Sequence, residues 1–470
     1  EQKTFKPVDV GGVAGGEKFM AKQLFLKYAR DNIKLRLYNG DAWAQKAAIH
    51  ELKSLNALIA CNIPNLHFPL MACLSCYGHY IVVVSKLPLS KNTLVYGSAN
   101  VAQTIQTDRE VGQLFKQAAE KLNLEPHLVV EGTTKLEKTM YGPVDIEGHK
   151  GMDGRSYIVD TARLFPPAPP VRGIRGCHLY KLLRKELVRT NPVPLSSDAF
   201  SFFGKVNAEH HNMEVKHAIN RIFTDLIPGL LERQDINELL CGGNITDTIH
   251  SLGINVRFLG CILASALKLP HITDASITCI VLEMVARASK AVFFHSMRTE
   301  CDETKSKRDE CRRLAAIHWN YLLFAEANYV PVVVQHDPLV PILSREEVQA
   351  WWNFDLIPTL KQRFIFFSGD PEWVVPTTEQ LEQAANAVLN PALIERVKRS
   401  PLDLFNRTRQ LCGVVFSDAI LEQVDKQGNA YFLGDVNNSQ AKTNRKLLET
   451  EDVTEILVLD KRVQFVPFAD

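Results

Sequence analysis

Short apolar runs bounded by turn residues predict buried β-strands in the first part of the chain. Tyr80 to Ser85 is the clearest run, because it is rich in the β-branched residues that favour strands. Tyr157 to Val159 is another, and it follows Asp153-Gly154, a pair typical of hairpin turns because glycine tolerates a positive φ. These runs predict a sheet with a hairpin turn at Asp153-Gly154.

Apolar residues that recur every three or four positions predict amphipathic helices elsewhere. In the first part this pattern occupies Glu17 to Asp31, Asp41 to Ala60 and Glu110 to Leu122, and Asp41 is the expected N-cap of the second helix. From about Ala208 the helical pattern dominates. The helical stretches there are Asn212–Leu231, Asn244–Ser251, Phe258–Leu269, Ala275–His295, Lys307–Asn328, Glu346–Phe364, Thr377–Leu389 and Leu393–Val397.

The two patterns divide the chain into regions of different character, and 470 residues are enough for two or three domains. We predict an α+β domain over residues 1–204, a helical region over 205–365, and a small helical or extended region over 366–470. One strand-like run, Tyr329 to Val334, interrupts the helical region. The expected fold class is therefore α+β, with a mixed domain followed by a mainly helical region.

The composition is that of an ordinary globular protein, with 46% hydrophobic and 23% charged residues. The formal net charge is +1, so no global field attracts the chain to nucleic acid or membrane, and RNA binding would need a local basic patch. No apolar run reaches the roughly 18–20 residues that span a bilayer, so membrane insertion is not expected. The first residue is Glu, which suggests a piece of a longer protein.

Residues typical of catalytic or metal sites are dispersed along the chain. Several of the ten cysteines lie in apolar contexts, which indicates reduced thiols in the cytosol or nucleus. Cys73 and Cys76 form a C-x-x-C without the second pair that a zinc site needs. Ser196-Ser197-Asp198 is interpreted as an N-cap before Ala199. The sequence predicts no metal ion and no cofactor.

One polar cluster surrounds the predicted hairpin between Tyr141 and Pro167. Its members are Asp145, Glu147, His149, Asp153, Asp160 and Arg163. Carboxylates and an imidazole that converge can bind a metal ion or a phosphate. Aspartates also cap turns, and Asp160 can pair with Arg163 or with a backbone amide. Both interpretations stay open from the sequence.

The hairpin also supports an alternative hypothesis, a kinase-like nucleotide-binding enzyme or an inactive relative of one. The strand that ends at Asp160 is similar to the strand that ends at the metal-binding aspartate of kinases. In this hypothesis Asp145 is the base, His149 is its neighbour, and Lys46 or Lys22 contacts phosphate.

Three features of the sequence argue against kinase activity. The chain lacks the His-Arg-Asp and Asp-Phe-Gly motifs. After Gly11 to Gly16, Glu17 occupies the place of the lysine that a phosphate-binding loop requires. Lys46 and Glu51 lie on one predicted helix, which disfavours a lysine–glutamate pair between two elements. We therefore expect a non-catalytic protein.

A basic surface is predicted near residues 172–189. The stretch Leu179 to Arg189 has leucines on one side of a helical wheel and basic residues on the opposite side. With the two arginines that precede it, the set is Arg172, Arg175, Lys181, Arg184, Lys185 and Arg189. Such a surface can hold RNA phosphates. It is also the pattern of an amphipathic helix with a solvated face.

Five ordered stretches resemble the Clu (clustered mitochondria) protein family. They are Tyr38–Lys53, Leu66–Ala72, Val84–Ser98, Tyr141–Pro167 and Leu179–Phe200. Thr248 to Gly260 and Met284 to Lys290 are similar to the helical region that follows the Clu domain, a region associated with a large subunit of translation initiation factor 3. The ubiquitin-like region and the tetratricopeptide repeats of the family are not visible in this sequence.

The resemblance implies a cytoplasmic protein that binds messenger RNAs, often those for mitochondrial proteins, and influences mitochondrial distribution. It implies the ribosome or translation initiation factors as further partners, with the basic residues near 172–189 as candidate RNA contacts. A scaffold that binds a partner helix through its helical half is a further alternative. The sequence indicates neither the RNAs preferred nor an oligomeric state.

Overall fold

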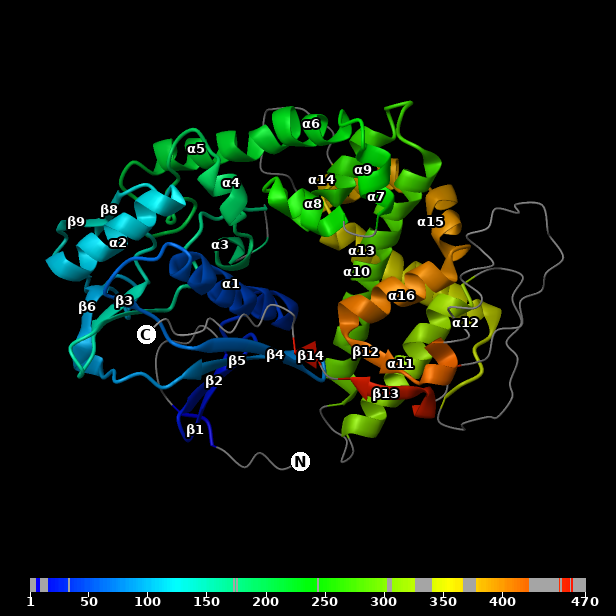
Figure 1. Cartoon of the computed structure of the whole chain (residues 1–470), viewed down its shortest axis with the longest axis horizontal. Helices are drawn as coiled ribbons and strands as arrows, with labels where there is room; N and C mark the ends of the chain where they lie inside the picture. Colours follow the sequence, from blue (N-terminus) through cyan, green and yellow to red (C-terminus); the bar gives the residue numbers. More distant parts are fainter. Residues whose placement is uncertain are drawn as a thin grey trace.

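A computed structural model describes residues 6–8, 16–32, 34–171, 174, 176–242, 245–301, 307–325, 340–366, 378–421, 448, 450–456 and 458–459. Two sheets with their covering helices form the first part of the molecule, and a bundle of helices forms the second (Figure 1). The predicted α+β class is confirmed. The expected strand at 329–334 lies outside the described residues.

The first sheet is antiparallel and has the strand order β1-β2-β5-β4-β14. Its strands are β1 (Glu17–Ala21), β2 (Leu24–Tyr28), β4 (Met71–Cys76), β5 (His79–Ser85) and β14 (Val458–Leu459). The predicted strand at Tyr80 to Ser85 is confirmed as β5. The last strand comes from the far end of the chain, so residues more than 370 positions apart pair in one sheet.

The helix predicted over Glu17 to Asp31 is wrong, because this stretch is the β1–β2 hairpin. Lys22 takes a φ of 55° in the two-residue turn, which reverses the chain. Strand β2 then pairs along its length with β5. Tertiary pairing with the β-branched run of β5 therefore overrides the helical spacing of the apolar residues.

Helix α1 (Asp41–Ile59) lies against β4 and β5 and buries Leu52, Leu55 and Leu58. The helix is as predicted, but its expected cap is wrong. Gly40 is the N-cap residue, and the Asp41 carboxylate accepts the backbone N–H of Asp31 at 2.8 Å. Asp41 still places a negative charge at the positive end of the helix dipole.

The second sheet has the order β3-β11-β10-β6-β7. Its strands are β3 (Leu66–His67), β11 (Ser156–Val159), β10 (Glu147–Lys150), β6 (Leu94–Gly97) and β7 (Gln106–Thr107). The predicted hairpin is confirmed, since β10 and β11 pair and Gly154 has a φ of +80°. Helix α2 (Arg109–Leu122) packs on β6, and β8 (His127–Val130) pairs with β9 (Glu137–Met140).

The single helix predicted over Leu179 to Arg189 is wrong. The chain forms two short helices, α3 (Cys177–Tyr180) and α4 (Lys185–Arg189). Between them, the N–H of Leu183 donates to the Pro166 carbonyl at 2.8 Å, and the N–H of Ala168 donates to the Lys181 carbonyl at 2.7 Å. The proline-rich stretch thus pairs with this segment through one antiparallel bridge, between Pro167 and Leu182, where the helix is interrupted.

The helical part contains most of the helices of the molecule. They are α5 (Ala208–Arg221), α6 (Ile227–Leu231), α7 (Ile236–Cys241), α8 (Ile245–Ser251), α9 (Leu259–Ala266), α10 (Asp274–Glu300), α11 (Lys307–Leu323), α12 (Arg345–Trp351), α13 (Ile357–Arg363), α14 (Thr378–Val388), α15 (Pro391–Lys398) and α16 (Pro401–Cys412). Each predicted helical stretch overlaps at least one of them. The long helix α10 is central and packs against α7, α9, α11, α13, α15 and α16. Beside α16, β12 (Val414–Phe416) pairs with β13 (Val453–Ile456).

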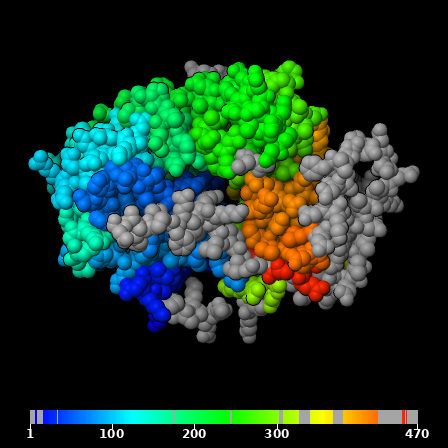
Figure 2. Space-filling model, in the orientation of Figure 1, coloured from blue at the N-terminus to red at the C-terminus, as the bar shows by residue number. Residues whose placement is uncertain are grey.

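The two parts share one hydrophobic core. Tyr80 of the first sheet packs edge-on against Phe294 of α10, and Arg298 donates to the Gly78 carbonyl at 2.8 Å. In the space-filling view the parts lie directly against each other (Figure 2). No individual helix among the described residues has the length and hydropathy to cross a bilayer, although α8 together with 256–266 meets both criteria with a bend of 109°.

Candidate functional site

A lysine and a glutamate join the first sheet to helix α1. Lys27 of β2 donates from Nζ to Oε1 of Glu51 in α1 at 2.6 Å, and the two side chains are 17% and 6% exposed. Burial alone would lower the pKa of Lys27, but Glu51 and then Asp160 more than reverse this effect and raise the pKa above its usual value. Lys27 is therefore charged, and its contact with Glu51 links two separate elements.

A second lysine lies beside the first. Lys18 of β1 is directly opposite Lys27 in the hairpin register, so the two side chains project from the same face of the sheet. Lys18 is buried, and burial followed by the charge of Lys27 lowers its pKa. Its other electrostatic partners are Asp160, Glu51 and Glu147. The hairpin thus presents two cations to a group of carboxylates.

Asp160 completes this group from the second sheet. It follows the last residue of β11 and adopts a left-handed backbone with a φ of 54°, which is uncommon for a residue other than glycine. Its side chain is exposed, yet shielding by surrounding protein and the charges of Glu51 and Glu147 raise its pKa to about 7, against the influence of Lys27.

This arrangement corrects the sequence interpretation of the phosphate-binding lysine. Lys22 lies exposed in the β1–β2 turn, and Lys46 lies among other cations, described below. The lysine that pairs with Glu51 is Lys27, which was missed because its stretch was assigned to a helix. In protein kinases a strand lysine paired with a helix glutamate holds the ATP phosphates, while an aspartate binds the magnesium ion. Lys27 and Glu51 form a strand–helix pair of this kind, and the charge of Asp160 acts on Lys27.

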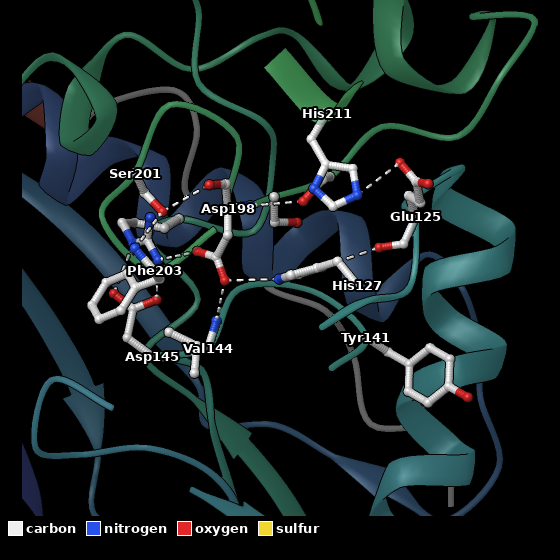
Figure 3. Close-up of polar contacts among 12 residues, drawn as sticks. Glu125, His127, Tyr141, Val144, Asp145, Asp198, Ser201, Phe203 and His211 are labelled. Atoms are coloured by element: carbon white, nitrogen blue, oxygen red, sulfur yellow. Dashed lines mark hydrogen bonds and ion pairs between the residues drawn. The ribbon is translucent and has the colours of Figure 1, made fainter. Parts of the chain in front are cut away.

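An ion-pair network centred on the buried Asp198 joins several segments of the first part (Figure 3). Arg163 donates from Nε and Nη2 to both carboxylate oxygens of Asp145, at 2.8 and 2.9 Å, and from Nη2 to Asp198 at 2.6 Å. The other oxygen of Asp198 lies 2.8 Å from His127 Nε2 and accepts the N–H of Val144 at 3.0 Å. Asp198 therefore ties the segment that carries Asp145 to β8.

One prediction about this network is wrong. Asp198 does not cap a helix, because its carboxylate is fully buried against Arg163 and His127. Of the two pairings that the sequence allowed for Asp160, the one with Arg163 does not form, since the ion-pair partners of Arg163 in the described structure are Asp145 and Asp198. Both carboxylate oxygens of Asp145 accept hydrogen bonds from Arg163, which makes Asp145 a poor candidate for a catalytic base.

The remaining hairpin residues make local contacts. His149 Nδ1 lies 3.0 Å from Thr93 Oγ1, and its Nε2 lies 3.3 Å from Glu147. Asp153 accepts the Tyr157 hydroxyl at 2.8 Å and the N–H of Arg155 at 3.2 Å, which is the turn-capping role that the sequence allowed. Within the described ranges no three metal-binding side chains come together.

The predicted basic residues do not share one helix face. Arg172 and Arg175 lie outside the described residues. Lys181 is half-buried with Nζ 5.9 Å from the centre of the Trp43 ring, and Arg184 pairs with Glu186 at 3.0 Å. Lys185 and Arg189 are exposed on α4 and remain the accessible members of the set. Their role as RNA contacts stays a prediction.

Comparisons with known proteins match two parts of the chain. Residues 2–169 match the family described as "Clustered mitochondria", and residues 239–353 match "Translation initiation factor eIF3 subunit 135". Residues 2–169 therefore form a Clu-family domain. Most of the first part of the structure, including Lys27, Glu51 and Asp160, falls within the Clu match. Asp198 and the exposed cations of α4 fall between the two matches.

Similar proteins come from distant eukaryotes. The "Clustered mitochondria protein homolog" of Caenorhabditis elegans is 30% identical over 135 residues, which is 27% of this chain and 11% of that protein. The homolog of Yarrowia lipolytica is 23% identical over 308 residues, or 56% of this chain and 25% of that protein. The "Clustered mitochondria protein" of Arabidopsis thaliana is 27% identical over 147 residues, or 30% and 10%. The matches span at most a quarter of these Clu relatives, and no solved structure matches the chain.

Proposed function

We propose that this Clu-family chain is a non-catalytic cytoplasmic protein that binds messenger RNA and acts in the distribution of mitochondria together with the translation machinery. One observation carries the proposal: a Clu match and an initiation-factor match occur in one chain whose two parts share a hydrophobic core. The printed names of the relatives support the mitochondrial part, and the initiation-factor match supports the association with translation.

The RNA contact that we propose is the surface around α4. Because the chain carries a net charge of only +1, binding depends on local cations. Lys185 and Arg189 are exposed and four residues apart on the helix, so they project from the same side. Lys181 and Arg184 are nearby but already contact Trp43 and Glu186, which makes them weaker candidates.

Replacing Lys185 and Arg189 together by glutamate is expected to weaken RNA binding and its salt dependence. For a single strand, each lost phosphate contact removes about 0.7 from the slope of log K against log salt, so the slope should fall by about 1.4. The measurement is fluorescence anisotropy with a single-stranded RNA between about 50 and 200 mM salt. The matched control is Lys91→Glu with Arg109→Glu, because both residues are exposed and lie elsewhere.

An unchanged affinity and slope in the α4 variant would remove this surface from the proposal. A pulldown of translation factors with and without RNase separates RNA binding from a pure scaffold role. Partners that survive RNase at full yield would favour the scaffold.

A second candidate function is binding of nucleotide phosphates at Lys27, Glu51 and Asp160. The observation that favours it is the ion pair between β2 and α1 beside an aspartate at a strand end. In this role Lys27 contacts phosphate, Glu51 orients Lys27, and Asp160 faces the magnesium ion that accompanies the nucleotide. Because Asp145 is held by Arg163, we propose binding without phosphate transfer.

Titration of the full chain with ATP and Mg²⁺ is expected to release or absorb heat, and Lys27→Met and Asp160→Asn should each weaken binding about ten- to a hundredfold. The control is Lys22→Met, which removes an exposed lysine from the same hairpin. Since Asp160 has a pKa of about 7 and binds metal only when ionised, binding should strengthen as the pH rises through 7. Absence of heat with the wild type, or equal loss in Lys22→Met, would exclude the site.

A further inference from the structure

Four basic side chains come together where the Clu domain meets the helical part. Lys46 belongs to α1, and Lys181 lies between α3 and α4. Arg257 belongs to η3 (Val256–Phe258), and Arg363 is the last residue of α13. In Figure 1 α1 and α3 lie on the side of the first part that faces α8 and α13.

The four cations form two pairs, and each pair is placed by its own contacts. The Nζ atoms of Lys46 and Lys181 lie 5.4 and 5.9 Å from the centre of the same indole ring, that of Trp43. On the other side of the junction, the N–H of Ile365 donates to the Arg257 carbonyl at 2.7 Å, which brings the end of α13 beside η3. The charges of Arg257 and Arg363 act on Lys46, and that of Arg257 acts on Lys181, so the two pairs belong to one region.

None of the four cations has a carboxylate partner within the described structure. Arg257 is only 8% exposed, and its Nε and Nη1 atoms have no hydrogen-bond partner there. Lys46 is half-buried, and Arg363 is exposed, so the region can be reached from solvent. A buried guanidinium without an anion is costly, and such a group is expected to have an anionic partner.

The electrostatics agree with the geometry. Burial and then the charges of Arg257, Arg363 and Lys181 hold the pKa of Lys46 well below its usual value. Burial lowers the pKa of Arg257 to about 10, and burial followed by Arg287 lowers that of Arg363 to about 10. Three of the cations thus disfavour the charged form of Lys46, Arg257 also disfavours that of Lys181, and a bound anion would favour the charged forms.

We propose that Lys46, Lys181, Arg257 and Arg363 bind a small molecule that carries several phosphate groups. The guanidinium groups of Arg257 and Arg363 present paired N–H donors that match phosphate oxygens, and the two ammonium groups add point charges. Four cations exceed what a single phosphate neutralises. Because Arg257 is almost fully buried, a compact polyanion fits the region better than a nucleic acid. This proposal does not depend on RNA binding at α4.

The test is calorimetry and thermal unfolding of the full chain with inositol hexakisphosphate, tripolyphosphate, inorganic phosphate and a single-stranded RNA. We expect both polyphosphates to bind and to raise the unfolding temperature, because a ligand specific for the native state stabilises it. Inorganic phosphate should bind much more weakly, and added salt should weaken all binding. A response to RNA alone would overturn this proposal and leave the proposed function intact. No response to any polyphosphate would also overturn it.

The decisive variant is Arg257→Met, with Lys91→Met as the control that removes an exposed cation outside every binding surface proposed for this chain. Loss of Arg257 should weaken polyphosphate binding about ten- to a hundredfold. Without ligand, the same variant should unfold at the wild-type temperature or higher, because it removes an unpaired buried charge. Lys91→Met should bind polyphosphate like the wild type. If Arg257→Met lowers the unfolding temperature and keeps wild-type affinity, the arginine is structural and the proposal is wrong.

Discussion

Replacing Asp198 by alanine is expected to lower the free energy of unfolding by about 3–5 kcal/mol, the cost of removing one member of a buried ion pair. The side chain of Asp198 is fully buried and lies between Arg163 and His127, whose side chains are 4% and 0% exposed. Without the carboxylate, Arg163 keeps its ion pair with Asp145, but His127 and the N–H of Val144 lose their acceptor. The measurement is urea unfolding followed by tryptophan fluorescence.

The control for this variant is Asp153→Ala, which removes an exposed carboxylate from the hairpin turn. Asp153→Ala should lower the free energy of unfolding by roughly 0.5–1.5 kcal/mol, the contribution of an ordinary hydrogen bond. Equal destabilisation by the two variants would contradict the assignment of Asp198 as the centre of the network.

The same network predicts how stability depends on pH. Burial would raise the pKa of Asp198, but Arg163 and then His127 more than reverse this and hold it well below its usual value. A carboxyl group with a lowered folded-state pKa contributes stability above its unfolded pKa of about 3.9, and that contribution is lost as the pH falls further. Asp198→Asn should therefore be less stable than the wild type at neutral pH, and the difference should shrink below about pH 4.

The fold class and several helices and strands could be predicted from local sequence patterns. The α+β class, strand β5, the β10–β11 hairpin and the main helices follow from apolar periodicity and turn residues. The hairpin at 17–28 was missed because its apolar spacing suits a helix, while its pairing with β5, more than 50 residues away, decides the outcome. The helix near 181 is interrupted for a similar reason, because Lys181 and Leu183 pair with the proline-rich stretch at 166–168.

The candidate site was harder to predict because its residues meet only after folding. Ser196-Ser197-Asp198 has the local pattern of a helix cap, and nothing nearby in the sequence points to Arg163 or His127. Lys27 became recognisable as the partner of Glu51 only when its stretch proved to be a strand. The cations at the junction of the two parts come from four separate segments, so no sequence window contains them.

Separate and joint replacement of Lys27 and Glu51 is expected to distinguish a structural ion pair from one retained for binding. Lys27→Met leaves Glu51 as a largely buried carboxylate, and Glu51→Leu leaves Lys27 without its partner. Each change should cost about 2–3 kcal/mol, below the value for a fully buried pair because Lys27 keeps some contact with solvent. The double variant, which replaces both charges by apolar side chains of similar size, should lie within about 1 kcal/mol of the wild type.

The test is a double-mutant cycle from urea unfolding, with ATP and Mg²⁺ titrations on all four proteins. One outcome is a double variant that is as stable as the wild type and yet binds no nucleotide. In that case the ion pair is not needed for stability, and its role is contact with phosphate. If the costs of the two single changes simply add, Lys27 and Glu51 are not coupled, and the 2.6 Å contact has no energetic role. A double variant that keeps nucleotide binding would place the phosphate contact elsewhere, because no charged group would remain at either position.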